Sequence, residues 1–156
     1  MTGAAEPIYF FTKTDPYFEL SNFAPYGLDD DGVYWSSVEH YFQAQKFDAD
    51  AHADYRERIR RARSPKDAKS LGQSRSVPLR ADWEEIKEAV MLRALRLKFA
   101  RAELVELLLG TGARPLVEAS PHDAYWGAGK FGQGQNRLGV LLMQVRAELR
   151  EAAAGR

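Results

Sequence analysis

The aromatic side chains of this chain are concentrated in one quarter of its length. Of 18 Phe, Trp and Tyr residues, 12 lie between Tyr9 and Phe47, whereas the rest of the 156 residues is rich in Ala, Leu, Arg and Glu. Aromatic and β-branched residues favour strands, and the second composition favours helices. We therefore expect short strands and loops near the N-terminus and helices over most of the remaining chain.

Local patterns predict where the elements lie. The β-prone runs are Ile8–Phe11 and Val33–Trp35. Helices are expected from Ser36 or Ser37 to about residue 47, and then over about 51–62, 64–72, 82–99 and 104–108, with a final helix of about 15 residues after the glycine-rich loop 120–135. An apolar content of 45% is enough for one core. The sequence thus predicts a single, predominantly helical α+β domain over residues 1–156, with its core at about 8–150.

Charge and residue types exclude several classes of function. The chain has 22 basic and 22 acidic residues, so its net charge does not attract it to nucleic acid or to a membrane. The absence of cysteine excludes disulfides, thiolate nucleophiles and cysteine-ligated zinc. Three histidines without a zinc-binding spacing predict no metal site, and no cofactor is expected. No signal peptide or membrane-spanning run is visible, so a cytoplasmic location is expected.

A basic stretch departs from this overall neutrality. Between residues 55 and 80, nine Lys and Arg residues stand against Glu57 and Asp67, which gives a local charge of +7. Such a stretch is either a solvated helix face with internal ion pairs or a surface that meets phosphate groups. The residues alone leave both interpretations open.

The first candidate site lies in residues 35–47. Helical spacing places Glu39, Gln43 and Lys46 on one face, at i, i+4 and i+7. In one interpretation Ser36 and Glu39 form a capping box, and Lys46 is a surface residue. In the other, the aromatic residues around Glu39 raise the pKa of its carboxyl group for acid–base chemistry.

The second candidate site is the segment 118–129, which combines carboxylates, an imidazole, a Trp-Gly step and several glycines. Asp123 is either the acceptor of a loop turn or a functional carboxylate, and Trp126 is either packed or part of a site. The run from Gly127 to Gly132 matches G-x-G-x-x-G but lacks the strand and βαβ frame of a dinucleotide site.

Three sequence blocks occur in order along the chain. These blocks are E-H-Y-F-Q-A-Q-K at 39–46, D-A-Y-W-G at 123–127 and G-Q-N-R-L-G at 134–139. In them the chain resembles the NADAR family of YbiA-like N-glycosidases. The resemblance runs from Tyr9 to Leu149. It implies a compact, mainly helical domain that hydrolyses the bond between ribose C1′ and a base. It also implies catalytic roles for Glu39, Asp123 and Trp126, and substrate binding by Asn22, Phe23, Trp35, Lys46, Tyr125, Gly127 and Asn136.

Two substrate classes follow from this resemblance. One is a small ribosyl-phosphate molecule, namely the ribosylaminopyrimidine phosphates of early riboflavin biosynthesis; the other is ADP-ribose attached to guanine bases in DNA. A non-catalytic module that binds ADP-ribose or NAD is a third alternative. The residues suit the glycosidase chemistry, because carboxylates stabilise an oxocarbenium-like transition state and aromatic rings stack on a base. No membrane partner is expected, and the oligomeric state is left open.

Overall fold

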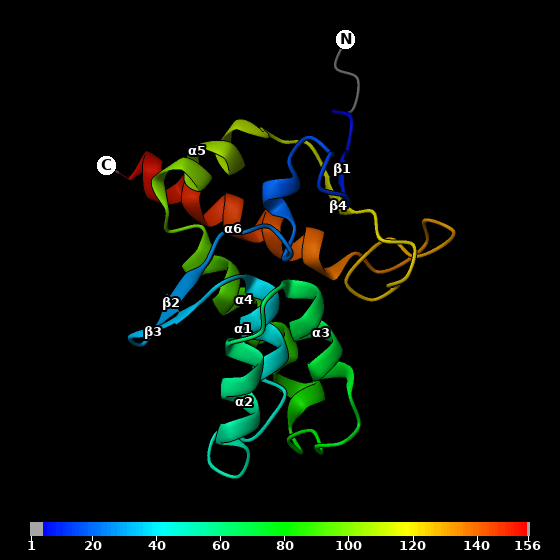
Figure 1. Ribbon diagram of the computed structural model, residues 1–156. Coiled ribbons are helices and arrows are strands. Elements are labelled where there is room, and N and C mark those ends of the chain that lie inside the picture. The colour runs from blue at the N-terminus through cyan, green and yellow to red at the C-terminus, as the bar shows by residue number, and fades with distance from the viewer. Residues whose placement is uncertain (1–4, 156) are drawn as a thin grey trace. The chain divides into compact units, whose positions relative to one another are not determined.

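The computed structural model describes residues 5–155. Within them it has six α-helices, one 3-10 helix and four strands of three residues each, which confirms the predominantly helical α+β class (Figure 1). These residues form two compact units, one comprising 22–98 and the other 5–21 together with 99–155. A single domain over the whole chain stays a prediction. No helix of the described residues is long and apolar enough to cross a membrane.

The 22–98 unit begins with a hairpin. β2 (Leu28–Asp30) and β3 (Val33–Trp35) are antiparallel, and the turn between them places Asp31 and Gly32 at φ angles of 55° and 87°. An Asp-Gly pair with both residues at positive φ suits the tight turn of a two-residue hairpin. The expected strand at 33–35 is therefore confirmed.

Four helices follow the hairpin in this unit. They are α1 (Val38–Ala44), α2 (Ala53–Arg60), α3 (Pro65–Gln73) and α4 (Trp83–Lys98). α1 packs against the other three helices, and all seven of its residues are buried. It is shorter than the predicted helix, which extended to about residue 47, because the helix ends at Ala44 and residues 45–46 form a turn. The predicted helices at 51–62, 64–72 and 82–99 are confirmed to within a few residues.

The other unit joins the two ends of the chain. β1 (Ile8–Phe10) pairs in parallel with β4 (Leu116–Glu118), and a 3-10 helix, η1 (Phe18–Leu20), follows β1. α5 (Ala102–Gly110) and α6 (Arg137–Ala154) complete this unit, and α6 packs against both β4 and α5. α6 has 18 residues, three more than expected. The loop between β4 and α6 carries the second group of predicted site residues.

Candidate active site

The predicted site residues fall into two groups, one in each unit. The first group is on α1 or near it in the 22–98 unit, and its members are Asn22, Phe23, Trp35, Glu39 and Lys46. The second is on the loop before α6 in the other unit, and its members are Asp123, Tyr125, Trp126, Gly127 and Asn136.

Glu39 is a buried carboxylate on α1, with only 7% of its surface exposed. Gln43 Nε2 donates a hydrogen bond to Glu39 Oε2 at 2.7 Å. The capping box predicted from Ser36 and Glu39 is wrong, because the helix begins one residue later: Ser37 is the N-cap, and its hydroxyl accepts from the His40 N–H at 3.2 Å. The carboxylate of Glu39 is thus oriented by a side chain one helical turn further on.

Lys46 lies in the turn just after the end of α1 and is half-buried. Burial holds the pKa of its ammonium group below the usual range, the neighbouring Lys69 acts in the same direction, and the attraction of the Glu39 carboxylate opposes both. Lys46 Nζ lies 5.9 Å from the centre of the Phe42 ring. The predicted shared helix face is confirmed for Glu39 and Gln43, whereas Lys46 lies beyond the end of α1 and near enough to Glu39 to be attracted by its carboxylate. Lys46 is not the surface residue of the capping interpretation.

Phe23 and Lys69, which lie outside α1, pack beside each other near Lys46. Lys69 on α3 places its Nζ 5.8 Å from the centre of the Phe23 ring. Ammonium groups are attracted to the faces of aromatic rings at such distances. We define the α1 cluster as Phe23, Glu39, Gln43, Lys46 and Lys69. It combines an oriented carboxylate with two cations and an aromatic ring, which is a suitable environment for a sugar phosphate.

Asn22 precedes this cluster in the chain and contacts its helix. Its carbonyl oxygen accepts from the Glu39 N–H at 3.2 Å, and its side-chain Nδ2 lies 3.6 Å from Met91 Sδ. Asn22 Oδ1 is buried and has no partner among the described residues. The backbone of Asn22 therefore supports the first turn of α1, and substrate binding by its side chain stays a prediction.

Trp35 packs on a different side of α1. Its ring centre lies 5.5 Å from that of Tyr41, which is two residues from Glu39 and so on nearly the opposite helix face. The Tyr41 hydroxyl donates to Asp30 at 2.7 Å, and Asp30 is also paired with Arg93. Burial raises the pKa of Tyr41. Trp35 thus belongs to the packing of the hairpin on α1, and its contact with substrate stays a prediction.

Asp123 is the acceptor of a loop turn, as one of its two interpretations predicted. Its Oδ1 accepts from the N–H groups of Tyr125 at 2.9 Å and Trp126 at 2.8 Å. The turn sets the Tyr125 and Trp126 rings edge to face, with their centres 4.9 Å apart. The turn interpretation is confirmed. A catalytic role for Asp123 stays a prediction, since the turn uses one of the two carboxylate oxygens.

The loop is tied to the start of α6 through the main chain. The carbonyl oxygens of Tyr125 and Trp126 accept from the N–H groups of Arg137 and Leu138, both at 3.0 Å. These two N–H groups would otherwise lack partners, as at the start of any helix. The backbone of the D-A-Y-W-G segment is therefore fixed, and the two aromatic rings project from a rigid support.

Asn136 and Gly127 have structural tasks in this loop. The Asn136 amide donates to the Leu116 carbonyl and accepts from the Glu118 N–H, both at 2.9 Å, so it extends the edge of β4. A Cβ at Gly127 would lie 3.0 Å from the carbonyl oxygens of Asp123 and Glu118, which leaves little space for a side chain. Substrate contacts of Asn136 and Gly127 stay predictions.

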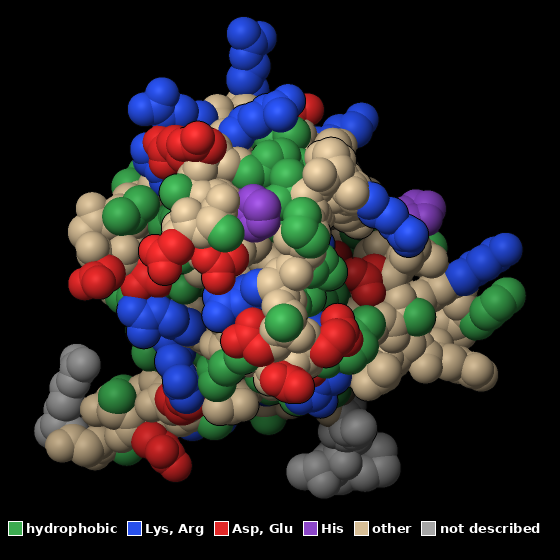
Figure 2. Space-filling model, turned by 90° about the horizontal axis from the view of Figure 1, so that it is seen from below, with side chains coloured by type: hydrophobic (Ala, Val, Ile, Leu, Met, Phe, Trp, Pro, Cys, Tyr) green, Lys and Arg blue, Asp and Glu red, His purple; other side chains and the backbone are tan. Residues whose placement is uncertain are grey.

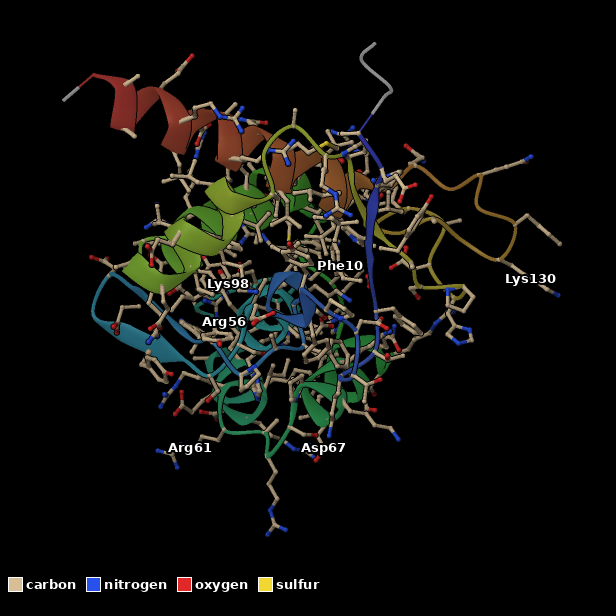
Figure 3. The ribbon with its side chains drawn as sticks, turned by 90° about the horizontal axis from the view of Figure 1, so that it is seen from above. Phe10, Arg56, Arg61, Asp67, Lys98 and Lys130 are labelled. Carbon is tan, nitrogen blue, oxygen red and sulfur yellow. The ribbon has the colours of Figure 1, made fainter. Side chains whose placement is uncertain are left out.

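The basic stretch contains several internal ion pairs. Arg60 and Arg61 both pair with Glu57, at 2.5 Å and 2.8 Å, and Arg56 donates to the Phe47 carbonyl at 3.0 Å. Figure 3 shows Arg56 among the helices and Arg61 projecting outward. In the view of Figure 2, basic side chains lie among acidic ones. The solvated, ion-paired interpretation therefore holds for part of the stretch.

Three arginines of the stretch nevertheless share a surface groove. It has a volume of about 540 Å³, and its lining includes Arg58, Arg61 and Arg63 together with Asp67 and Ser70. All three arginines are exposed. The groove is the part of the basic stretch that suits a phosphate-bearing partner.

A metal site finds no support in the described residues, which hold no group of three or more His, Asp or Glu side chains able to bind an ion. Both ring nitrogens of His40 are already engaged, Nδ1 with the Ser37 hydroxyl at 2.7 Å and Nε2 with the Ala62 carbonyl at 3.0 Å. Burial lowers the pKa of His40. Activity without a metal stays a prediction, and base release after treatment with EDTA tests it.

Sequence reasoning missed part of the α1 cluster. Gln43 was placed on the correct face, and its spacing of four residues from Glu39 is a signal for a side-chain hydrogen bond within a helix. Lys69 was counted only as one charge of the basic stretch. Its position beside Phe23 and Lys46 depends on how α3 packs against α1, and no local pattern reports that.

Comparisons with known proteins agree with these observations. The family model of the NADAR domain matches residues 9–150. N-glycosidase YbiA of Escherichia coli (strain K12) is 51% identical over 143 residues, which are 91% of this chain and 88% of YbiA. An NMR structure of E. coli YbiA superposes with a TM-score of 0.88 at 47% identity, covering 99% of this chain and 91% of that one.

Two further relatives are less similar to this chain. An N-glycosidase of Nostoc punctiforme is 43% identical over 144 residues, 92% of each chain. The chloroplastic riboflavin biosynthesis protein PYRR of Zea mays is 42% identical, with 91% of this chain matching 25% of that protein. The maize protein is thus much longer, and the similarity concerns one part of it.

Proposed function

The chain belongs to the NADAR domain family and is an N-glycosidase, and we propose that its substrates are the ribosylaminopyrimidine phosphates of early riboflavin biosynthesis. Hydrolysis of the bond between ribose C1′ and nitrogen would yield ribose 5-phosphate and a free pyrimidine. The name of the maize relative supports this substrate class. The observation that carries the proposal is the buried Glu39 carboxylate, which Gln43 orients beside Lys46.

Glu39 supplies the negative charge that this reaction requires. As the bond from C1′ to nitrogen breaks, positive charge develops on C1′ and the ring oxygen, and a carboxylate in a site of low polarity stabilises it. The oxygen of a water molecule adds to C1′ and gives up a proton, for which Glu39 is the proposed acceptor. The departing nitrogen takes up a proton, so that atoms and charge balance.

Lys46 and Lys69 are the proposed ligands of the substrate phosphate. The charge of Lys46 interacts with both Glu39 and Lys69, and Lys69 lies beside the Phe23 ring. The partial burial of Lys46 strengthens its attraction to an anion. One or two cations are sufficient for a single phosphate group. The Phe23 ring beside Lys69 provides an apolar wall for the sugar.

Asp123 and Trp126 are proposed to act on the base. The turn that Asp123 forms presents the Trp126 ring from a fixed backbone, and a pyrimidine can stack on such a ring. Asp123 is also the proposed second carboxylate that assists departure of the base. The Tyr125 ring packs nearly perpendicular to the Trp126 ring beside it.

A second substrate class is supported by one surface feature. The groove lined by Arg58, Arg61 and Arg63 offers several exposed cations, as a nucleic acid backbone requires. It supports ADP-ribose on guanine bases in DNA as an alternative substrate. The overall neutrality of the chain favours the small molecule.

Release of the base from both substrates tests these proposals directly. The protein is incubated with a ribosylaminopyrimidine phosphate and, separately, with DNA that carries ADP-ribosylated guanine. We expect faster release from the small molecule, and strongly reduced release by Glu39→Gln. Release from the DNA alone would contradict the proposed substrate, and binding of ADP-ribose without release of any base would contradict an enzymatic role.

A further inference from the structure

We propose that Gln43 and Gly72 are positioning residues for the Glu39 carboxylate. The space left by the missing side chain of Gly72 on α3 accommodates the Gln43 amide on α1, and this amide orients Glu39. The inference rests on the proposed catalytic role of Glu39. It concerns two residues from different helices that do not themselves contact the reacting bond.

The fit between Gly72 and Gln43 is too close for any side chain at position 72. A Cβ built on Gly72 would lie 1.9 Å from Gln43 Oε1, 2.7 Å from Cδ and 2.8 Å from Cβ. Carbon atoms in contact normally stay about 3.5 to 4.0 Å apart. A methyl group at this position would therefore displace the Gln43 side chain or push the two helices apart.

Neither adjustment is easy in this part of the molecule. Gln43 is 4% exposed on a helix that is buried on every side. The Tyr55 hydroxyl of α2 donates to the Leu71 carbonyl at 2.5 Å, which holds α3 immediately before Gly72. Both helices are thus fixed at the point where the methyl group would be added.

The hydrogen bonding of Gln43 shows which end of its amide matters. Nε2 donates to Glu39 Oε2 at 2.7 Å, whereas Oε1 is buried and has no partner among the described residues. A buried acceptor without a partner costs free energy. The arrangement therefore favours the donor end, which contacts the carboxylate, at the expense of the acceptor end.

Glycine at position 72 is unfavourable for the helix itself. Gly72 lies inside α3 with a helical backbone that alanine adopts equally well, and alanine is the better helix former. The need for glycine thus comes from Gln43 and not from the backbone. Substitution of Gly72 by alanine therefore favours the helix but removes the space that the Gln43 amide occupies.

Two substitutions test the proposal by activity. Gly72→Ala and Gln43→Met should each lower kcat at least tenfold and change KM less than twofold. Gln43→Met should also shift the acid limb of the kcat profile to higher pH, because the amide stabilises the ionised carboxylate. The matched control is Gly110→Ala in α5, where an added Cβ meets nothing within 4 Å and activity should be unchanged. A kcat of Gln43→Met within twofold of wild type would overturn the proposal.

An NMR titration tests the proposal without any substrate. The side-chain amide signals of Gln43 should shift as the Glu39 carboxyl group ionises, and Glu39→Gln should abolish this shift. In Gly72→Ala the shift should be strongly reduced, and an unchanged shift would contradict the proposal. If wild-type protein releases no base but shows the titration, the proposed function fails while the positioning of Glu39 stands.

Discussion

The α1 cluster and the loop before α6 each carry a predicted catalytic carboxylate, but the two carboxylates are supported in opposite ways. On α1 the Gln43 side chain orients the Glu39 carboxylate inside a buried helix. In the loop the Asp123 carboxylate orients main-chain N–H groups and so forms the turn around Trp126. The side chain of Glu39 is thus held by a neighbouring residue, whereas the side chain of Asp123 holds the backbone of its own loop.

Glu39 and Asp123 also differ in whether they stabilise the local backbone. A capping or turn role was an interpretation for both residues, and it is wrong for the Ser36–Glu39 pair and confirmed for Asp123. Substitutions at Glu39 should therefore alter chemistry with little effect on stability. Substitutions at Asp123 should alter both, to an extent that depends on whether an acceptor remains.

The largest expected effect is that of Glu39→Gln. The amide keeps an acceptor for Gln43 but removes the negative charge, so base release should fall on the order of 100-fold or more while the melting temperature stays nearly unchanged. The surface substitution Glu103→Gln is the control. Activity of Glu39→Gln within threefold of wild type would show that the carboxylate is not catalytic.

Asp123 should respond to alanine and asparagine differently. Asp123→Ala removes both main-chain hydrogen bonds and should lower the free energy of unfolding in urea by about 1 to 3 kcal/mol. Asp123→Asn retains an acceptor for the turn, so it should keep most of the stability while turnover falls about tenfold. The exposed Asp29→Ala is the control for both measurements. If asparagine were as destabilising as alanine, the charge and not the turn would be the important property.

His40 offers a test of the buried helix through pH. Burial lowers its pKa below the ordinary 6.5, so the unfolded chain binds a proton that the folded protein does not. The contribution of neutral His40 to the free energy of unfolding should therefore be complete above about pH 6.5 and decrease as the pH falls below this value. We expect the free energy of unfolding to drop from pH 7.5 to 5.5, and to drop less in His40→Gln. The exposed His122→Gln should keep the wild-type slope, and an equal slope in His40→Gln would contradict the prediction.

The smallest effect is expected for the arginine groove. Replacing Arg58, Arg61 and Arg63 by Gln should change KM for the proposed sugar phosphate less than twofold, because its proposed phosphate ligands are Lys46 and Lys69. The affinity of the protein for a DNA substrate would instead fall. The slope of log K against log salt concentration would decrease by roughly 0.9 for each phosphate contact removed. A triple substitution of Lys13, Arg101 and Arg150 is the control of equal charge.

Much of the α1 cluster and of the loop turn could be predicted from the sequence. The shared face of Glu39 and Gln43 follows from their spacing of four residues on one helix. The Asp123 turn follows from the short reach of an Asp side chain to the next residues. The sequence left Ser36 and Ser37 open as the N-cap of this helix, because both are equally good caps by type, and the N-cap is Ser37. Packing decided between them.

The sequence by itself determined which residues share a helix face, where a carboxylate can form a turn and how much of the chain is helical. These properties depend on residues only a few positions apart. Only the tertiary structure decided that Gly72 and Lys69 of α3 lie beside α1, and that the Asn136 amide extends β4. Such contacts join segments that are distant in the chain, and the close packing of buried side chains selects among the many pairings that the local patterns allow.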